Sequence, residues 1–319
     1  MKDTALKIVF SSLRLTIAIM KNGNKKRVIV DTDPAIGLPL KDVDDGLAIF
    51  LLIASAEVSI RGLTINFGNT TQKRAFKVAK EVLEVAKRNI PVIRGAESRK
   101  ELGRESAASR FLIKEVKENP GKISLLAIAP LTNVATAIKT DSNFAPNLGE
   151  LVVMGGAIQK RGNIPPTFKA EFNFWSDPEA AKIVLSAPAP KTLIPVDVCQ
   201  QVVFKREDYR RLKMSRSKVA KYITKNIYSW LLINKVISKR GGFYPWDVVA
   251  AAFLIDKDLF KLKTFLLDVR VRGLERGKVE VLEEEGRKGK DWIRVAMRIE
   301  KERFMDLFLR RIGSYGDKT

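Results

Sequence analysis

Five aspartates lie close together near the start of the chain, in the segment DTDPAIGLPLKDVDD that spans residues 31–45. Grouped carboxylates repel one another, so a fold keeps them together only where something offsets that repulsion. A hard divalent cation does so, and a donor set made only of oxygen atoms suits calcium or magnesium. The segment therefore predicts a calcium or magnesium site. A solvated loop of helix-capping aspartates is the structural alternative.

The chain contains no histidine. This absence excludes a Ser-His-Asp triad, a Cys-His pair and zinc or iron held by histidine. Any catalysis must then rest on carboxylates, amides, lysine or arginine, hydroxyls and a bound metal. The single cysteine, Cys199, allows no internal disulfide. A reducing, cytoplasmic location is therefore predicted.

The formal net charge of the chain is +22. One interpretation is a basic surface that attracts nucleic acid or another polyanion. The other is a surface rich in lysine and arginine with interspersed acids, of the kind that adaptation to heat favours. Because the charges are spread along the whole chain, we expect the second and predict no nucleic-acid partner. No run of about 18 uncharged apolar residues occurs, so no membrane partner is expected either.

The elements that would position the aspartates alternate between strand and helix. Strands are predicted at residues 27–31, 58–65, 91–93, 123–128, 150–154, 192–196, 265–283 and 291–299. Helices are predicted at residues 45–54, 71–88, 105–117, 133–139, 178–186, 248–255 and 300–312. The strands are continuous apolar runs, which is typical of a parallel sheet covered on both faces. We predict a single α/β domain of the Rossmann-like kind, with a mostly parallel central sheet flanked by helices.

The predicted domain covers residues 27–312 and carries a basic, helical insertion at residues 205–240. Residues 313–319 are expected to form a tail. In residues 1–26, an apolar stretch is broken by Arg14 and no convincing cleavage site for a signal peptide follows. An amphipathic extension and an upstream start codon both remain as interpretations, so these residues are left out of the fold.

Polar clusters follow the ends of the predicted strands. They are Asp31–Thr32–Asp33, residues 66–69, Thr132–Asn133, Gly155–Gly156 and Asp197. In an open parallel sheet, ligands bind beyond the carboxyl ends of the strands, so these clusters should converge on one site. Asparagines at such places are also common turn formers and caps. Asn133, at the start of a predicted helix, is interpreted as a helix cap.

The aspartate segment resembles the signature of the nucleoside hydrolase family of the inosine-uridine preferring kind. In that signature an Asp-x-Asp-Pro strand end leads to a paired Asp-Asp that opens a helix. Further blocks of the family pattern follow in order over residues 27–312. They are Gly68–Asn69, Leu131–Thr132–Asn133, residues 153–157, Gly162–Asn163, Glu171–Phe172–Asn173 and residues 177–180. The resemblance implies the nucleoside hydrolase fold and calcium-dependent hydrolysis of ribonucleosides to free base and ribose.

The resemblance also implies roles for individual residues. It implies that calcium is held by Asp33, both oxygens of Asp45, Asp247 and the backbone carbonyl of Ile128. It implies that Asp44 is the general base and that Asp31 orients this group from behind. The implied ribose partners are Asn69, Asn163, Glu171 and Asn173, with Met154 packed against the sugar. A homodimer or homotetramer is expected as the assembly.

The chemistry of the reaction suits such a site. Breaking a ribosyl C–N bond develops positive charge on the sugar, as in glycoside hydrolysis. A calcium ion with open positions can hold the ribose hydroxyls and a water, and a neighbouring carboxylate can remove a proton from that water. Anionic side chains around the sugar stabilise the developing cation. Amide side chains that read the hydroxyls should disfavour deoxyribosides.

The sequence departs from the family pattern between its two pairs of aspartates. Ala35 stands where the family has a glycine, and residues 36–43 form an apparent insertion. The loop of residues 35–43 can bulge outward and leave the ligands unmoved. It can also supply Asp42 as a ligand instead.

A second departure concerns the acid that would protonate the leaving base. Many family members have a histidine just before the late aspartate, where this chain has Trp246. Purine-preferring members are thought to stack aromatic residues on the base, which raises its basicity. Trp246, Tyr244 and Trp175 are the candidates for base stacking here, with a core position as the alternative for Trp246. A purine preference is therefore expected.

Two other functions compete with this one. In a haloacid-dehalogenase-like phosphatase, an Asp-x-Asp after the first strand supplies a nucleophile and an acid/base around magnesium, and Asp31 and Asp33 fit that pattern in isolation. The later blocks do not belong to it. A non-catalytic ribonucleoside-binding protein is the third candidate. The presence of Asp44 argues against it, since calcium binding alone needs no base beside the ligands.

Overall fold

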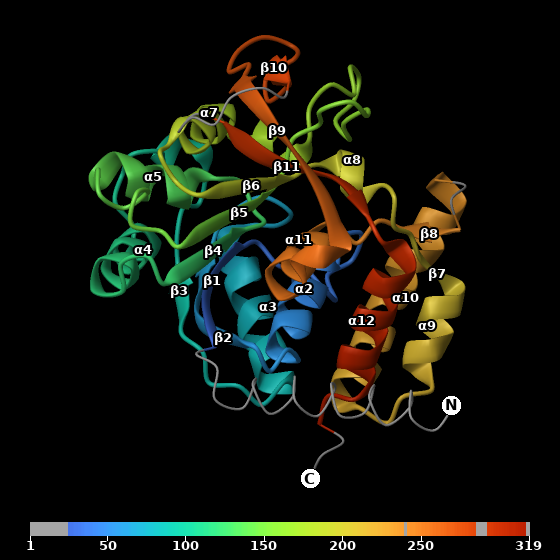
Figure 1. The fold of residues 1–319 in the computed structure, drawn as a ribbon. Helices are drawn as coiled ribbons and strands as arrows, with labels where there is room; N and C mark the ends of the chain where they lie inside the picture. Colours follow the sequence, from blue (N-terminus) through green and yellow to red (C-terminus); the bar gives the residue numbers. More distant parts are fainter. Residues whose placement is uncertain (1–24, 239–240, 285–291, 317–319) are drawn as a thin grey trace, which may run out of the picture.

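A nine-stranded sheet runs through the centre of the molecule in the computed structural model, which describes residues 25–238, 241–284 and 292–316 (Figure 1). In sheet order its strands are β10 (Val279–Glu284), β9 (Phe260–Val269), β11 (Ile293–Ile299), β6 (Lys191–Ile194), β5 (Glu150–Met154), β4 (Ile123–Ala127), β1 (Lys26–Thr32), β2 (Val58–Ile65) and β3 (Val92–Arg94). From β3 to β11 every neighbouring pair is parallel. The predicted mostly parallel sheet is confirmed.

The antiparallel part of the sheet lies at one edge. Strand β9 pairs antiparallel with both β11 and β10. Residues 265–283, predicted as strand throughout, are therefore two strands joined by a turn. Gly273 and Gly277 in this turn have φ angles of +80° and +82°, which glycine adopts without steric cost.

Helices cover both faces of the sheet (Figure 1). On one face lie α2 (Asp44–Ile53), α3 (Gln72–Val85), α11 (Trp246–Ile255) and α12 (Lys301–Gly313), with α9 (Arg206–Lys213) and α10 (Lys218–Ser238) beside them. On the other lie α4 (Ala107–Glu118), α5 (Thr132–Thr140) and α7 (Pro178–Ser186). Side chains of β1 alternate between the layers: Val28 and Val30 pack in the first and Ile29 in the second.

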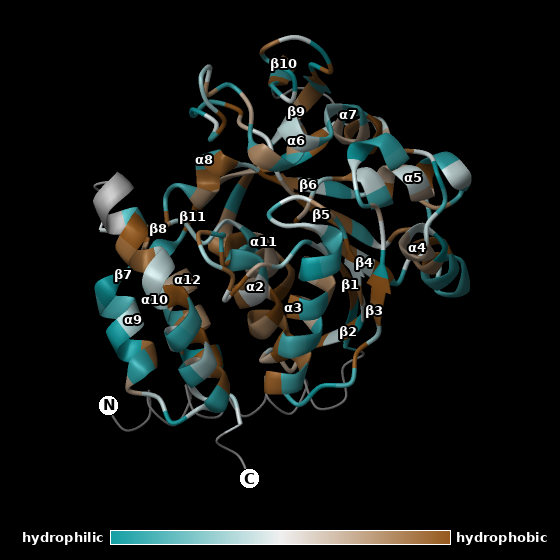
Figure 2. Ribbon diagram, turned by 180° about the vertical axis from the view of Figure 1, so that it is seen from behind, coloured by the Kyte–Doolittle hydropathy of each residue, from teal (hydrophilic) through white to brown (hydrophobic). Residues whose placement is uncertain are grey.

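The helices differ in how much of their surface is apolar. Helix α3 buries Ala75, Val78, Ala79 and Val82, the spacing of a helix with one apolar face. Helix α2 is buried at every position, because it lies between the sheet and its neighbour α11. Figure 2 shows the contrast between the hydrophilic outer helix α9 and the hydrophobic interior. Burial on all sides fixes the N-termini of α2 and α11 beside each other.

The remaining elements are short. They are α6 (Phe172–Ser176), α8 (Val196–Cys199), η1 (Arg99–Glu101), η2 (Lys257–Leu259), β7 (Phe204–Lys205) and β8 (Gly242–Phe243). The predicted helical region at residues 205–240 consists of α9 and α10, which pack against α12 and each other. The expected extension, apart from residues 25–26, and the last three residues of the expected tail lie outside the described residues. Among the described helices, none is long and apolar enough to cross a membrane.

Candidate active site

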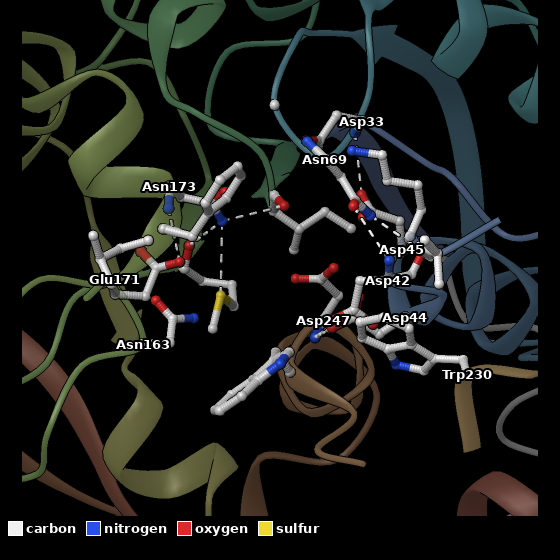
Figure 3. Close-up of a pocket in the computed structure, with 18 residues that line it drawn as sticks. Asp33, Asp42, Asp44, Asp45, Asn69, Asn163, Glu171, Asn173, Trp230 and Asp247 are labelled. Atoms are coloured by element: carbon white, nitrogen blue, oxygen red, sulfur yellow. Dashed lines mark hydrogen bonds between the residues drawn. The ribbon is translucent and has the colours of Figure 1, made fainter. Parts of the chain in front are cut away.

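A cavity of about 360 Å³ opens beyond the carboxyl ends of β1, β2, β4 and β5 (Figure 3). Its wall is formed by Asp33, Leu40, Lys41, Asp42, Asp44, Asp45, Gly68, Asn69, Ile128, Met154, Asn163, Ile164, Glu171, Phe172, Asn173, Trp230, Trp246 and Asp247. Figure 3 shows the aspartates and Asn69 on one side and Asn163, Glu171 and Asn173 on the opposite side. Two of the five polar clusters predicted to converge line this cavity, through Asp33 and through Gly68–Asn69. The clusters Thr132–Asn133, Gly155–Gly156 and Asp197 do not line it.

Three carboxylates form the centre of the acidic side. Asp44 and Asp45 begin α2, and Asp247 lies in the first turn of α11. One oxygen from each lies within 4.8 Å of the others. The backbone N–H of Asp247 donates to Oδ2 of Asp44 at 3.1 Å, which ties the two helix ends together. Helix N-termini favour negative charge, so both helices help to keep these carboxylates in place.

Keeping three ionised carboxylates buried together costs free energy unless a positive charge lies beside them. All three carboxylates are buried. Burial and then the charge of Asp44 raise the pKa of Asp45 to about 7, and burial likewise raises the pKa values of Asp44 and Asp247. Within the described part of the chain, no lysine or arginine nitrogen comes within 4.0 Å of these carboxylates. A buried, all-oxygen donor set without a counter-charge fits a hard divalent cation.

Asp33 lies in the same wall but belongs to a different set of contacts. Its backbone N–H donates to Oδ1 of Asp45 at 3.1 Å, and its Oδ2 accepts from the backbone N–H of Asn69. Oδ1 of Asp45 also accepts from the Thr32 hydroxyl at 2.5 Å. Gly68 has a φ of +149°, and a Cβ there would strike the Asp33 carboxylate. Asp33 thus contacts Asp45 through its backbone N–H and is not one of the three close carboxylates of Asp44, Asp45 and Asp247.

Asp31 is fully buried behind the cavity wall. Its Oδ1 accepts from the Thr64 hydroxyl at 2.6 Å and from Nδ2 of Asn133 at 2.8 Å. Burial raises the pKa of Asp31 to about 6, against the effect of these hydrogen bonds. Its position fits a residue that supports the cluster from behind.

The interpretation of Asn133 as a helix cap is wrong. The N-cap of α5 is Leu131, and Asn133 lies inside the helix. Its Oδ1 accepts from the backbone N–H of Ala96 at 2.8 Å while its Nδ2 donates to Asp31. The side chain joins three segments beneath the site. Sequence spacing could not separate these functions, because a cap and a buried bridge both place asparagine near a helix start.

On the opposite side of the cavity, Glu171 caps α6. Its carboxylate accepts from the backbone N–H groups of Asn173 (2.8 Å), Gly156 (3.1 Å) and Phe174 (3.2 Å). Burial raises its pKa to about 7, and these hydrogen bonds oppose the shift. Helix α6 was not expected from the sequence, since five residues carry little helical periodicity.

Asn173 connects two strand ends on this side. Its Nδ2 donates to the carbonyls of Met154 (3.3 Å) and Ile128 (3.4 Å). The carbonyl of Ile128 is therefore held where β4 ends, on the edge of the cavity. Asn163 and Met154 complete this part of the wall.

The loop at residues 36–43 turns toward the cavity. Leu40, which is 74% exposed, Lys41 and Asp42 all contribute to the wall. The Asn69 amide hydrogen-bonds the backbone of Asp42 in both directions, donating to its carbonyl at 3.2 Å and accepting from its N–H at 3.3 Å. Burial raises the pKa of Asp42 to about 6. In this arrangement the Asn69 side chain holds the loop, in addition to lining the cavity.

Two tryptophans supply the aromatic part of the wall. Trp246 begins α11, and Trp230 comes from α10. The ring of Tyr244 packs on Trp246 with centroids 4.7 Å apart but does not itself line the cavity. Trp175 was a candidate for base stacking, and its position does not support that role. It lies outside the cavity with the Arg276 guanidinium 4.4 Å above its ring.

Sequence reasoning missed Trp230. It lies in residues 205–240, which were interpreted as a basic, helical insertion and given no role. The signal that could have found it is a large aromatic residue in a helix otherwise rich in lysine.

Comparisons with known proteins match most of the chain. The model of the family described as inosine-uridine preferring nucleoside hydrolase matches residues 28–306. A probable uridine nucleosidase 2 of Arabidopsis thaliana is 33% identical over 288 residues, covering 81% of this chain and 86% of that protein. The pyrimidine-specific ribonucleoside hydrolase RihA of Salmonella arizonae is 26% identical and covers 91% and 99%. A solved plant nucleoside hydrolase superposes with a TM-score of 0.82 at 28% identity, covering 91% and 100%.

Proposed function

Since this chain belongs to the inosine-uridine preferring nucleoside hydrolase family and is a ribonucleoside N-ribohydrolase, we propose that it hydrolyses uridine in a calcium-dependent reaction. The observation that carries the proposal is the group formed by Asp44, Asp45 and Asp247. Three buried carboxylates face a cavity whose opposite wall is made of amides and one glutamate. The phosphatase alternative is excluded by the family, and a purely binding role is excluded with it.

Two of the three close carboxylates, Asp45 and Asp247, are assigned as metal ligands. The family pattern adds Asp33, whose backbone N–H contacts Asp45, and the carbonyl of Ile128. A calcium ion there would hold the ribose hydroxyls and lower the pKa of a water. Asp44, which hydrogen-bonds the backbone of Asp247, is the base that takes the proton from this water. Asp31 lies behind the group, where hydrogen bonds from Thr64 and Asn133 hold its carboxylate.

The amide side of the cavity binds the sugar. Asn163, Glu171 and Asn173 face the acidic side across the cavity (Figure 3). Glu171 in its ionised form would stabilise positive charge that develops on the ribose. Met154 packs against the ring of the sugar, and Asn69 positions loop 36–43 beside it.

The base lies against Trp230 and Trp246 in this proposal. Aromatic faces stack on purines and pyrimidines alike, so the two tryptophans do not select between them. The sequence favoured a purine preference, but four plant relatives that are 31–33% identical to this chain are named uridine nucleosidases or probable uridine nucleosidases. We therefore place uridine ahead of the purine ribonucleosides. The homodimer or homotetramer and the cytoplasmic location stay predictions.

The test is release of reducing sugar from uridine, cytidine, inosine and adenosine, each with calcium and with a chelator. Release from uridine that stops on chelation and returns with calcium supports the proposal. Equal release with and without chelator contradicts the calcium dependence. Faster release from inosine than from uridine contradicts the base preference. Deoxyuridine is the matched control, because it lacks the 2′-hydroxyl that the site should require.

A further inference from the structure

A second cavity, which we call the basic cavity, lies on the far side of α6 from the active site. It has a volume of about 440 Å³ and is lined by Arg99, Lys100, Asp177, Pro178, Glu179, Val271, Arg272, Gly273 and Arg276. Its walls come from η1, the start of α7 and the turn between β9 and β10. Helix α6 separates the two cavities, because Phe172 and Asn173 face the active site while Trp175 contacts Arg276.

The basic cavity holds more positive than negative charge. Four cationic side chains line it, against the carboxylates of Asp177 and Glu179. Asp177 is already engaged, since it accepts from the Thr132 hydroxyl at 2.5 Å and from the backbone N–H of Ala180 at 3.0 Å. In the described parts of the chain, none of the four cations forms an ion pair within 4.0 Å.

The nearby acidic residues of the same turn pair elsewhere. Glu275 forms ion pairs with Arg270 at 2.8 Å and with Lys278 at 3.3 Å. Glu280 pairs with Arg270 at 2.6 Å. Arg272 and Arg276 are thus left to face the cavity, although carboxylates lie close to them in sequence.

Arg276 is held in the wall of the basic cavity by an aromatic ring. Its guanidinium stacks on the Trp175 ring at 4.4 Å, and its Nε is buried without a hydrogen-bond acceptor. Stacking occupies the face of a guanidinium and leaves its in-plane N–H groups to bind an oxyanion. Nε is enclosed by the protein, so the terminal nitrogens of the guanidinium are the groups left for a ligand in the basic cavity.

We propose that the basic cavity binds a phosphate group, either as free phosphate or as part of a small phosphorylated sugar. A tetrahedral anion presents oxygens toward several cations at once, whereas a carboxylate presents only two. Arg276 and Arg272 contact the phosphate, with Arg99 and Lys100 facing them from η1. Binding should change the fluorescence of Trp175, since the ligand shares Arg276 with that ring.

The test is titration calorimetry of the full chain with inorganic phosphate and with ribose 5-phosphate. We expect saturable binding that weakens by about tenfold or more in Arg272→Ala and in Arg276→Ala. Arg74→Ala, which removes an exposed arginine from α3, should change the affinity by less than about twofold. Arg272 is exposed, so its variant should fold even if Arg276→Ala does not.

The outcomes distinguish free phosphate from a sugar phosphate, and the basic cavity from the active site. Tighter binding of ribose 5-phosphate supports the sugar phosphate, and equal binding supports free phosphate. Asp45→Ala should bind phosphate as the unmodified protein does, whether or not uridine is a substrate. No binding at about 10 mM phosphate overturns the proposal. Unchanged binding in Arg272→Ala and Arg276→Ala, or loss of binding in Asp45→Ala, overturns it too.

Discussion

The side chain of Asn69 and the backbone of Asp42 form a reciprocal pair of hydrogen bonds, with the amide donating at 3.2 Å and accepting at 3.3 Å. The Asn69 amide thus hydrogen-bonds both the N–H and the carbonyl of Asp42, as a residue of a neighbouring strand would do. The loop that separates Asp33 from Asp44 is therefore held against the cavity.

Removing the Asn69 amide should release this loop. We expect Asn69→Ala to lower kcat/KM by about tenfold and to speed trypsin cleavage after Lys41, because two hydrogen bonds are lost. Asn69→Asp keeps the acceptor and should have a smaller effect on both. Limited proteolysis and uridine kinetics measure the two effects. Unchanged cleavage at Lys41 in Asn69→Ala would show that the loop is held by other contacts.

Substitutions in the aspartate cluster should separate metal binding from proton transfer. Asp44→Asn should lower kcat by about 10² to 10⁴ while calcium still binds, since a general base contributes in this range. Asp45→Asn should lose calcium and activity together. Asp42→Asn is the matched control and should keep calcium. Calorimetry with calcium alone gives the comparison, and loss of calcium in Asp44→Asn would make Asp44 a ligand.

The buried acids should make stability depend on pH and metal. Burial raises the pKa of Asp31 to about 6 and that of Asp45 to about 7. The folded protein then binds more protons than the unfolded chain between about pH 4 and pH 7, so the free energy of unfolding falls as pH rises through that window. Calcium favours the ionised carboxylates and should raise Tm more at pH 8 than at pH 5.

Thermal melting at both pH values, with chelator and with calcium, checks this expectation. A chelated protein whose Tm rises between pH 5 and pH 8 would contradict it. Glu171 contributes in the same direction, because burial also raises its pKa to about 7.

Asn133→Ala should destabilise the fold by about 2–4 kcal/mol, because it removes one of the hydrogen bonds to the buried Asp31 carboxylate and leaves the Ala96 N–H without a buried partner. A simple helix cap would cost about 1 kcal/mol. Urea unfolding measures the difference. Asn143→Ala, at an exposed position, is the control and should be nearly neutral. If Asn133→Ala lowers the free energy of unfolding by no more than the control does, Asn133 does not stabilise the site.

The tryptophans should fall into two classes. Trp230→Ala and Trp246→Ala should raise KM for uridine by about tenfold, which is the scale of one lost base–aromatic contact. Trp175→Ala should leave KM unchanged and lower Tm, because its ring packs with Arg276 outside the cavity. Uridine kinetics and melting curves separate the classes. A higher KM in Trp175→Ala alone would reverse the assignment.

The central sheet and most helix boundaries could be predicted, because buried parallel strands and amphipathic helices impose strong apolar periodicities. The places of Asp33 and Asn69 at one cavity followed from strand ends meeting at one edge, whereas those of Asp44, Asp45, Glu171 and Asn173 were implied by the resemblance to the family. The contacts of Asn133 and the position of Trp175 could not be predicted. They depend on which segments meet across the fold, and a single sequence carries no pattern for that.

The hydrogen bond between Asp247 and Asp44 joins residues 203 positions apart in the chain. An ion gripping both helix ends would act as a removable cross-link that closes most of the polypeptide into one loop. Chain-entropy arguments value a closure of this length at about 5 kcal/mol, comparable with a long-range disulfide. In this protein, which has one cysteine, the bound ion would thus stabilise the fold in the way that a disulfide stabilises many secreted proteins. Its lifetime in the folded state would then follow the supply of that ion.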